Sequence, residues 1–111
     1  MKIMAKTSSS GDILAPIFSG ENYDFWRIKM RTVFITHDLW SLVKEGYIVP
    51  EDVAALSAAE KLALKSNIKR DSKALGVIQN AVTDEIFASI SNEETTNGAW
   101  EVLQDEFRGS A

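Results

Sequence analysis

The stretch Phe18-Ser-Gly-Glu-Asn-Tyr-Asp-Phe-Trp-Arg-Ile-Lys-Met30 decides the fold of this chain. A turn at Ser19-Gly20 comes first, and Asn22 is then suited to cap the free amides of a helix. The apolar residues that follow, at spacings of three and four, share one helical face: Tyr23, Trp26, Met30, Val33 and Phe34. A second apolar strip adjoins it: Phe25, Ile28, Thr32 and Ile35. The pattern predicts a central helix, Tyr23 to His37, covered on two sides.

Composition is typical of one small globular domain. The 111 residues are 45% hydrophobic and 25% charged, as in soluble proteins. Cysteine is absent, which excludes disulfides and thiol chemistry in this sequence and fits a reducing, cytoplasmic location. The net charge of −4 argues against nucleic-acid binding by the whole surface. No apolar run approaches the roughly 20 residues of a membrane span.

The N-terminal part divides into a tail and a segment that packs on the core. Residues 1–12 are polar and rich in small residues, which predicts a disordered lead-in. Ile13 to Phe18 is apolar and contains Pro16, so we expect an extended segment against the core. An unpaired edge there could accept a partner strand. We expect one helical domain over 13–109, and a short tail, 110–111.

Four further helices are expected. A short one runs from Leu39 to Glu45 and stops at Gly46; Tyr47 to Pro50 is extended. Ser57 and Glu60 form a capping box that opens a long helix to about Ala81. Its apolar residues predict one buried stripe: Leu64, Ile68, Leu75, Ile78 and Val82. Within that helix, Gly76 would permit a close helix contact. A short helix follows Thr83, and Thr95 or Thr96 caps a last one, Asn97 to Phe107.

These elements predict an all-α fold, a compact bundle of about five helices with a short extended N-terminal segment. The large apolar residues on the inner faces are the expected core anchors. They are Trp26, Met30, Phe34, Trp40, Leu75, Ile78, Trp100, Leu103 and Phe107.

No constellation of residues indicates catalysis, a metal or a cofactor. His37 is the only histidine, and its place at a helix C-terminus is explained by the helix dipole. The carboxylates lie in loops or near helix starts, where they are ordinarily solvated. We therefore expect no enzyme, no metal site and no cofactor.

Two groups of residues are candidates for partner binding. Four lysines recur every fourth residue of the long helix, with an arginine beside them: Lys61, Lys65, Lys69, Arg70 and Lys73. Such a stripe is either a solvated face or a docking face for an acidic partner or nucleic acid. It lacks interleaved aromatic residues, so RNA stacking is not expected. Ile17, Phe18 and Tyr23 are the residues best placed to line a groove.

Several motifs resemble one known family in their order and combination. They are Phe18-x-Gly20-x-Asn22-Tyr23-x-x-Trp26-x-x-x-Met30, Leu39-Trp40-x-x-Val43-x-x-Gly46, Ala74-Leu75-x-x-Ile78, and Ala99-Trp100-x-x-Leu103-x-x-x-Phe107-x-Gly109. Together they resemble the Gag polyprotein of plant Copia-type LTR retrotransposons, over about Pro16 to Gly109.

The resemblance implies a capsid-type N-terminal lobe, an all-helical fold similar to that of retroviral capsids. In such elements Gag assembles a shell around the element RNA, and a second lobe and a zinc knuckle would lie further downstream. The knuckle needs cysteines, which this sequence lacks, so nucleic-acid binding is not expected here.

Two functions follow as hypotheses. The first is a structural, non-enzymatic domain that associates weakly with itself, as a homo-oligomer or a lattice. The second is a peptide- or protein-binding adaptor in a domesticated host copy, because a domesticated neuronal relative uses this lobe to bind short peptides.

Overall fold

A computed structural model describes residues 14–108, which form five α-helices, one short 3₁₀ helix and no β-strand. In chain order they are α1 (Tyr23–Thr36), α2 (Trp40–Glu45), the 3₁₀ helix η2 (Val53–Ala55), α3 (Ala58–Asn80), α4 (Asp84–Ile90) and α5 (Thr96–Phe107). The predicted all-α class is confirmed. The expected lead-in, 1–12, and tail, 110–111, lie outside the described residues, and the expected domain is described from residue 14 to residue 108.

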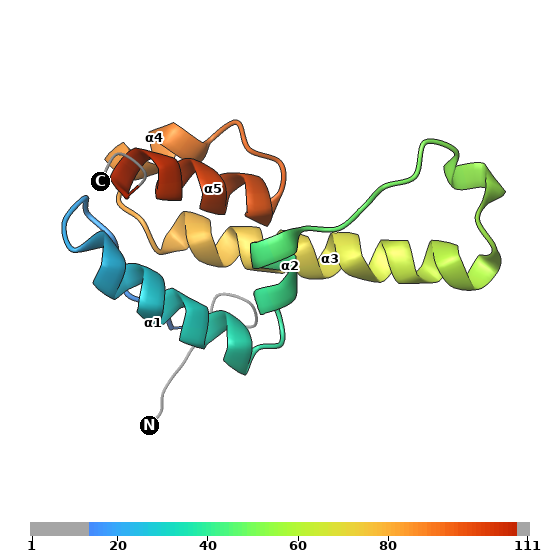
Figure 1. Cartoon of the computed structure of the whole chain (residues 1–111), viewed down its shortest axis with the longest axis horizontal. Helices are drawn as coiled ribbons and strands as arrows, with labels where there is room; N and C mark the ends of the chain where they lie inside the picture. Colours follow the sequence, from blue (N-terminus) through green and yellow to red (C-terminus); the bar gives the residue numbers. More distant parts are fainter. Residues whose placement is uncertain (1–13, 109–111) are drawn as a thin grey trace, which may run out of the picture.

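The core lies between α1, the C-terminal half of α3, and α5 (Figure 1). Six of the expected anchors are buried, namely Trp26, Met30, Phe34, Ile78, Trp100 and Leu103, while Trp40, Leu75 and Phe107 are partly buried against them. Trp26 stacks on Trp100 at 5.8 Å between ring centroids, and Trp40 meets Trp100 edge-on at 5.6 Å. Each fully buried large side chain stabilises the fold by roughly 1.5–3 kcal/mol.

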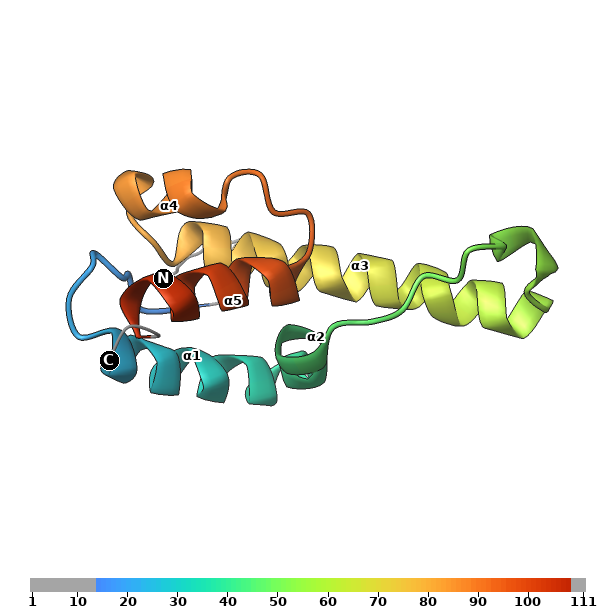
Figure 2. The same ribbon diagram turned by 45° about the horizontal axis from the view of Figure 1, so that its top comes forward.

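Helix α1 buries one face only. Tyr23, Trp26, Met30 and Phe34 face the core, as their spacing predicts. The expectation of a second covered side was wrong, because Phe25, Ile28, Thr32 and Ile35 are all exposed. The remaining elements pack on one side of α1, as Figure 2 shows. Spacing identifies an apolar strip, but it does not tell whether another element covers that strip.

The start of α1 also differs from expectation. Asn22 adopts a left-handed conformation, φ 57° and ψ 47°, and its side chain makes no capping hydrogen bond. Asparagine tolerates this conformation better than most residues. Asn22 therefore turns the chain into α1 rather than capping it, while Asp24 lies in the first turn as predicted.

Helix α2 ends at Gly46, as predicted. Gly46 has φ 77° and ψ −165°, a region that only glycine visits readily. A Cβ there would lie 3.4 Å from Cβ of Asn97. The Asn97 side-chain amide donates to the backbone oxygens of Val43 and Lys44, both at 3.0 Å. The end of α2 is therefore fixed against the first turn of α5.

Helix α3 begins with the predicted capping box. Ser57 N–H donates to Glu60 Oε1 at 2.8 Å, and Glu60 N–H donates to Ser57 Oγ at 3.1 Å. The predicted buried stripe is confirmed only at its C-terminal end, where Ile78 and Val82 are buried. Only Asp71, Ala74, Val77 and Ile78 are buried in this helix, whereas Ile68 is exposed and Leu64 and Leu75 are half-buried.

The N-terminal half of α3 projects from the body, because no other helix covers it (Figure 1). The chain leaves α2, runs outward along α3, turns through η2 and returns in α3 itself (Figure 2). No residue from 46 to 70 is buried, and we call this segment the arm. Gly76 lies beyond the arm, where an added Cβ would meet nothing within 4 Å. The close helix contact expected at Gly76 is therefore absent.

The N-terminal segment is extended against the core, as predicted. Phe18 is buried and forms an isolated parallel bridge with Val82. Its N–H donates to Ala81 O at 2.8 Å, and its carbonyl accepts from Thr83 N–H at 3.0 Å. The backbone edge at Phe18 is thus already occupied by the α3–α4 junction.

Candidate interaction surfaces

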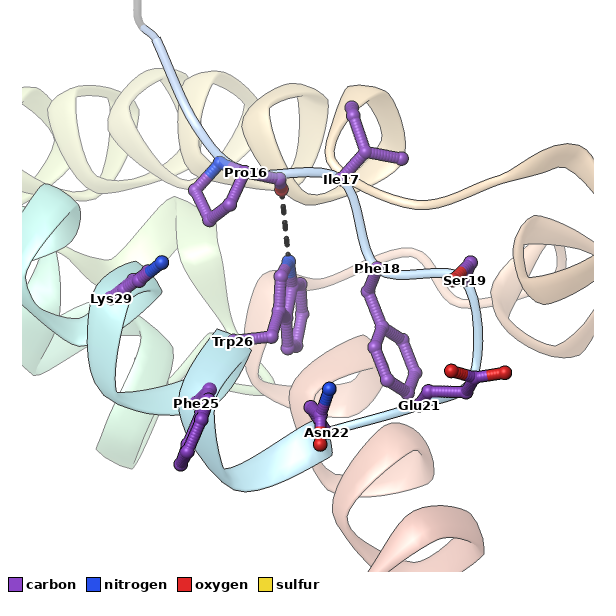
Figure 3. A pocket seen from close by; sticks show the side chains of 9 residues that line it. All are labelled: Pro16, Ile17, Phe18, Ser19, Glu21, Asn22, Phe25, Trp26 and Lys29. Atoms are coloured by element: carbon purple, nitrogen blue, oxygen red, sulfur yellow. Dashed lines mark hydrogen bonds between the residues drawn. The ribbon is translucent and has the colours of Figure 1, made fainter.

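A groove of about 270 Å³ separates the N-terminal segment from α1 (Figure 3). Its lining residues are Pro16, Ile17, Phe18, Ser19, Glu21, Asn22, Phe25, Trp26 and Lys29. The Trp26 Nε1–H donates to both Pro16 O and Ala81 O, each at 3.1 Å. This shared donor ties the segment, α1 and the end of α3 together, so the groove has fixed walls.

The three residues expected to line a groove differ in accessibility. Ile17 is 60% exposed, whereas Phe18 and Tyr23 are 1% and 6% exposed and point into the core. Burial raises the pKa of Tyr23 to about 12, and its hydroxyl has no hydrogen-bond partner among the described residues. Of these three, only Ile17 offers a large apolar surface to a ligand. Phe25 is a further wall residue, and Figure 3 shows it on the side of α1 away from Trp26.

The basic residues of α3 divide into two groups. Lys61, Lys65, Lys69 and Lys73 are exposed, and none of these lysines pairs with a carboxylate within residues 14–108. Arg70, in contrast, donates to the backbone oxygen of Asp38 and lies 4.0 Å from its carboxylate. The lysines form a free basic surface, while Arg70 joins α3 to the turn between α1 and α2.

The arm also carries exposed apolar side chains, the largest being Ile48, Val49, Val53, Leu62 and Ile68. A shallow pocket of about 200 Å³ lies between the outgoing chain and α3, lined by Ile48, Pro50, Leu56, Glu60, Ala63, Leu64 and Asn67. The arm therefore combines basic and apolar surface outside the core.

The most regular apolar surface is the outer strip of α1, formed by Phe25, Ile28, Thr32 and Ile35. Phe25, Ile28 and Ile35 are 67%, 53% and 51% exposed. Scattered exposed apolar residues are ordinary, but a contiguous apolar row more often marks an interaction site. The spacing of these residues identified the strip, but the prediction that another element covers it was wrong.

Two buried polar residues join α3 to α5, of which only Thr96 was expected from the sequence, as a candidate cap, whereas Asp71 was not. Asp71 and Thr96 are 2% and 0% exposed, and they connect α3 to the first turn of α5. A charged residue within a lysine-rich helix gives no signal of burial, because aspartates are mostly solvated.

Neither a candidate metal site nor a membrane-spanning helix is found among the described residues. No group of three or more His, Cys, Asp or Glu residues between 14 and 108 could hold a metal ion. His37 lies exposed at the C-terminus of α1, as predicted. No helix in that part of the chain is long and apolar enough to cross a membrane.

Comparison with known proteins gives one match. A family model described as gag-polypeptide of LTR copia-type matches residues 30–111, more than half of the chain. The match begins within α1 and includes α2 to α5. Neither the curated proteins nor the solved structures yield a match to this chain.

Proposed function

This chain belongs to the gag-polypeptide family of LTR copia-type elements, and we propose that it is a structural, non-enzymatic domain that associates with copies of itself. Family membership indicates the structural Gag role, and the self-association is our proposal. The single observation that favours self-association is the outer strip of α1, an apolar helix face that no described element covers.

The size of the exposed surfaces suits weak contacts. A stable pair buries roughly 800 Å² per partner, and a row of three large apolar side chains on one helix supplies only part of that area. Weak contacts become effective when many copies each make several of them, because later contacts form at high effective concentration. We therefore expect a monomer in dilute solution and larger species as concentration rises.

Light scattering across a concentration series, from micromolar to millimolar protein, tests this proposal. The expected result is a mass that increases with concentration and returns to the monomer on dilution. Repeating the series at low and high salt separates the two kinds of surface, because salt screens the exposed lysines but not apolar contacts. A mass that stays at 12.3 kDa up to millimolar protein would count decisively against self-association.

A second candidate function is favoured by the groove beside Ile17 and Phe25. An adaptor domain would bind a short peptide there, with an apolar side chain against Ile17 and an acidic residue near Lys29, while Ser19, Glu21 and Asn22 make the rest of the lining polar. Because Trp26 lines the groove, its fluorescence would report binding. Titration with a panel of acidic-hydrophobic peptides tests this function, and Ile17→Asp is the variant expected to abolish the response. Flat titrations across the panel would eliminate it.

A further inference from the structure

We propose that the outer strip of α1 pairs with the same strip of a second copy, with the two helices parallel and in register. This inference rests on the proposed self-association and names the surface that performs it. It uses a helix face opposite the one that holds the core.

The spacing of the strip is that of a helix-pairing seam. Phe25, Ile28, Thr32 and Ile35 follow one another at three, four and three residues, which matches the a and d positions of two consecutive heptads. The buried face of the same helix uses other residues, namely Tyr23, Trp26, Met30 and Phe34. A narrow a/d row suits pairing with one other helix, whereas a wider stripe suits a globular core. The expected occupant is therefore a single helix with a matching row.

The charges beside the seam select a second copy in parallel orientation. In the heptad frame Asp24 and Arg31 occupy g positions, and Lys29 and Thr36 occupy e positions. All four are exposed, and Asp24 also lies 3.6 Å from Arg27 and 3.8 Å from Arg108 of its own chain. A parallel pair brings g against the following e position of the other helix, so Asp24 meets Lys29 of the second copy, and the same contact is repeated by symmetry.

The antiparallel arrangement is unfavourable at two flanking positions, Lys29 and Arg31. There g faces g and e faces e, so Arg31 would meet Arg31 of the second copy and Lys29 would meet Lys29. Like charges at close range disfavour the wrong register. The charges of α1 therefore favour the parallel orientation over the antiparallel one.

The seam is short, which limits the affinity of one helix for its partner. From Phe25 to Ile35 the helix rises about 15 Å, less than the length of a stable free coiled coil. The pair is therefore concentration-dependent and is strengthened when each copy also contacts others.

Engineered cysteines test the pairing and its orientation, because the chain contains none of its own. At concentrations where light scattering shows association, mild oxidation of Ile28→Cys is expected to give a disulfide-linked dimer. A parallel register brings the two Cα atoms within the roughly 4.4–6.8 Å that a disulfide needs. Ser89→Cys, exposed on α4, is the matched control and should give only collisional dimer.

Mixing Ile28→Cys with Thr32→Cys distinguishes the two orientations. A parallel pair links each variant to its own kind, and mass spectrometry should find few mixed dimers. An antiparallel pair places Ile28 opposite Thr32 and would give mainly mixed dimers, which overturns the proposed orientation.

Charge exchange provides an independent readout. Asp24→Lys and Lys29→Asp should each weaken self-association at low salt. Mixed in equal amounts they should recover it, because each lysine at 24 then faces an aspartate at 29. Failure of the mixture to recover association would contradict the parallel register.

Ile28→Asp separates this proposal from the proposed function. We expect an unchanged thermal melt, because Ile28 is exposed, and association weakened at least tenfold, with Ser89→Asp as the control. If Ile28→Asp associates like the unaltered chain, self-association stands and the α1 pairing is overturned. If the unaltered chain itself remains monomeric at millimolar concentration, both proposals fail.

Discussion

Thr96 donates two hydrogen bonds to Asp71, one from its backbone N–H to the carboxylate, 3.2 Å to Oδ2, and one from its hydroxyl to the Asp71 backbone oxygen at 2.7 Å. Both residues are buried. The pair joins the first turn of α5 to α3 at the point where α3 leaves the body and becomes the arm. This contact therefore fixes the first turn of α5 against α3 beside the base of the arm.

Asp71→Ala should lower the free energy of unfolding by about 1–3 kcal/mol, because it leaves the Thr96 N–H buried without an acceptor. Urea unfolding followed by tryptophan fluorescence measures the change. Glu94→Ala, at an exposed loop position, is the control and should stay within about 0.5 kcal/mol. Equal stability of the two variants would mean that water replaces the lost acceptor.

Trp26→Ala should destabilise the fold by roughly 3–5 kcal/mol, since Trp26 is 4% exposed and its indole N–H holds the N-terminal segment. Trp40→Ala should cost clearly less, because Trp40 is only partly buried. Thermal melts by circular dichroism compare the two variants. A Trp26→Ala melt close to that of the unaltered protein would contradict the central position of this side chain.

Gly46→Ala and Gly76→Ala should have opposite effects. At Gly46 the backbone conformation is nearly restricted to glycine, so alanine should cost about 1–3 kcal/mol. Gly76 lies inside α3 with open space around its Cα, so alanine there should stabilise by up to about 1 kcal/mol. Urea midpoints measured side by side provide the test, and a shift in the same direction for both would be inconsistent with this geometry.

Stability should fall in alkaline solution through Tyr23. Burial raises its pKa from 10.0 to about 12 in the folded state, so the folded protein favours the neutral phenol. Below pH 10 both states are protonated and the stability is fully present. Between about pH 10 and 12 the unfolded chain ionises first, and the loss approaches roughly 3 kcal/mol at about 1.4 kcal/mol per unit.

Tyrosinate absorbance in Tyr47→Phe isolates the titration of Tyr23, and Tyr23→Phe should abolish its share of the alkaline destabilisation. The two tyrosines must be separated in this way because burial also raises the pKa of Tyr47. A Tyr23 titration near pH 10 in the folded protein would show that its hydroxyl reaches water.

The elements could be predicted because their signals are local. The spacing of Trp26, Met30 and Phe34 and the reciprocal bonds of Ser57 and Glu60 each depend on neighbours within one or two turns. What covers a helix is not a local property. The strip at Phe25, Ile28 and Ile35 and the row at Leu64 and Ile68 have the same spacing as core residues, yet no other helix covers them.

The interaction surfaces were predictable only in part, for the same reason. The lysines of α3 are exposed as a polar row should be, and Ile17 lies at the edge of a groove. Phe18 also lines that groove, as expected, although it is almost fully buried. Tyr23 does not line it, because its ring packs in the aromatic cluster around Trp26. The burial of Asp71 was not predicted, because no sequence signal distinguishes a buried aspartate from its solvated neighbours.

The arm and the body of the molecule should differ in how cooperatively they unfold. Residues 46–70 contribute no buried side chain, so their helical turns depend on the capping box and on local packing along α3. Amide hydrogens in that half of α3 should exchange with deuterium through local fraying, whereas those around Ala74 and Ile78 should exchange only when the whole body opens. Substitutions and short insertions near η2 should therefore leave the melting temperature almost unchanged, and this segment can diverge in sequence while the body retains its fold.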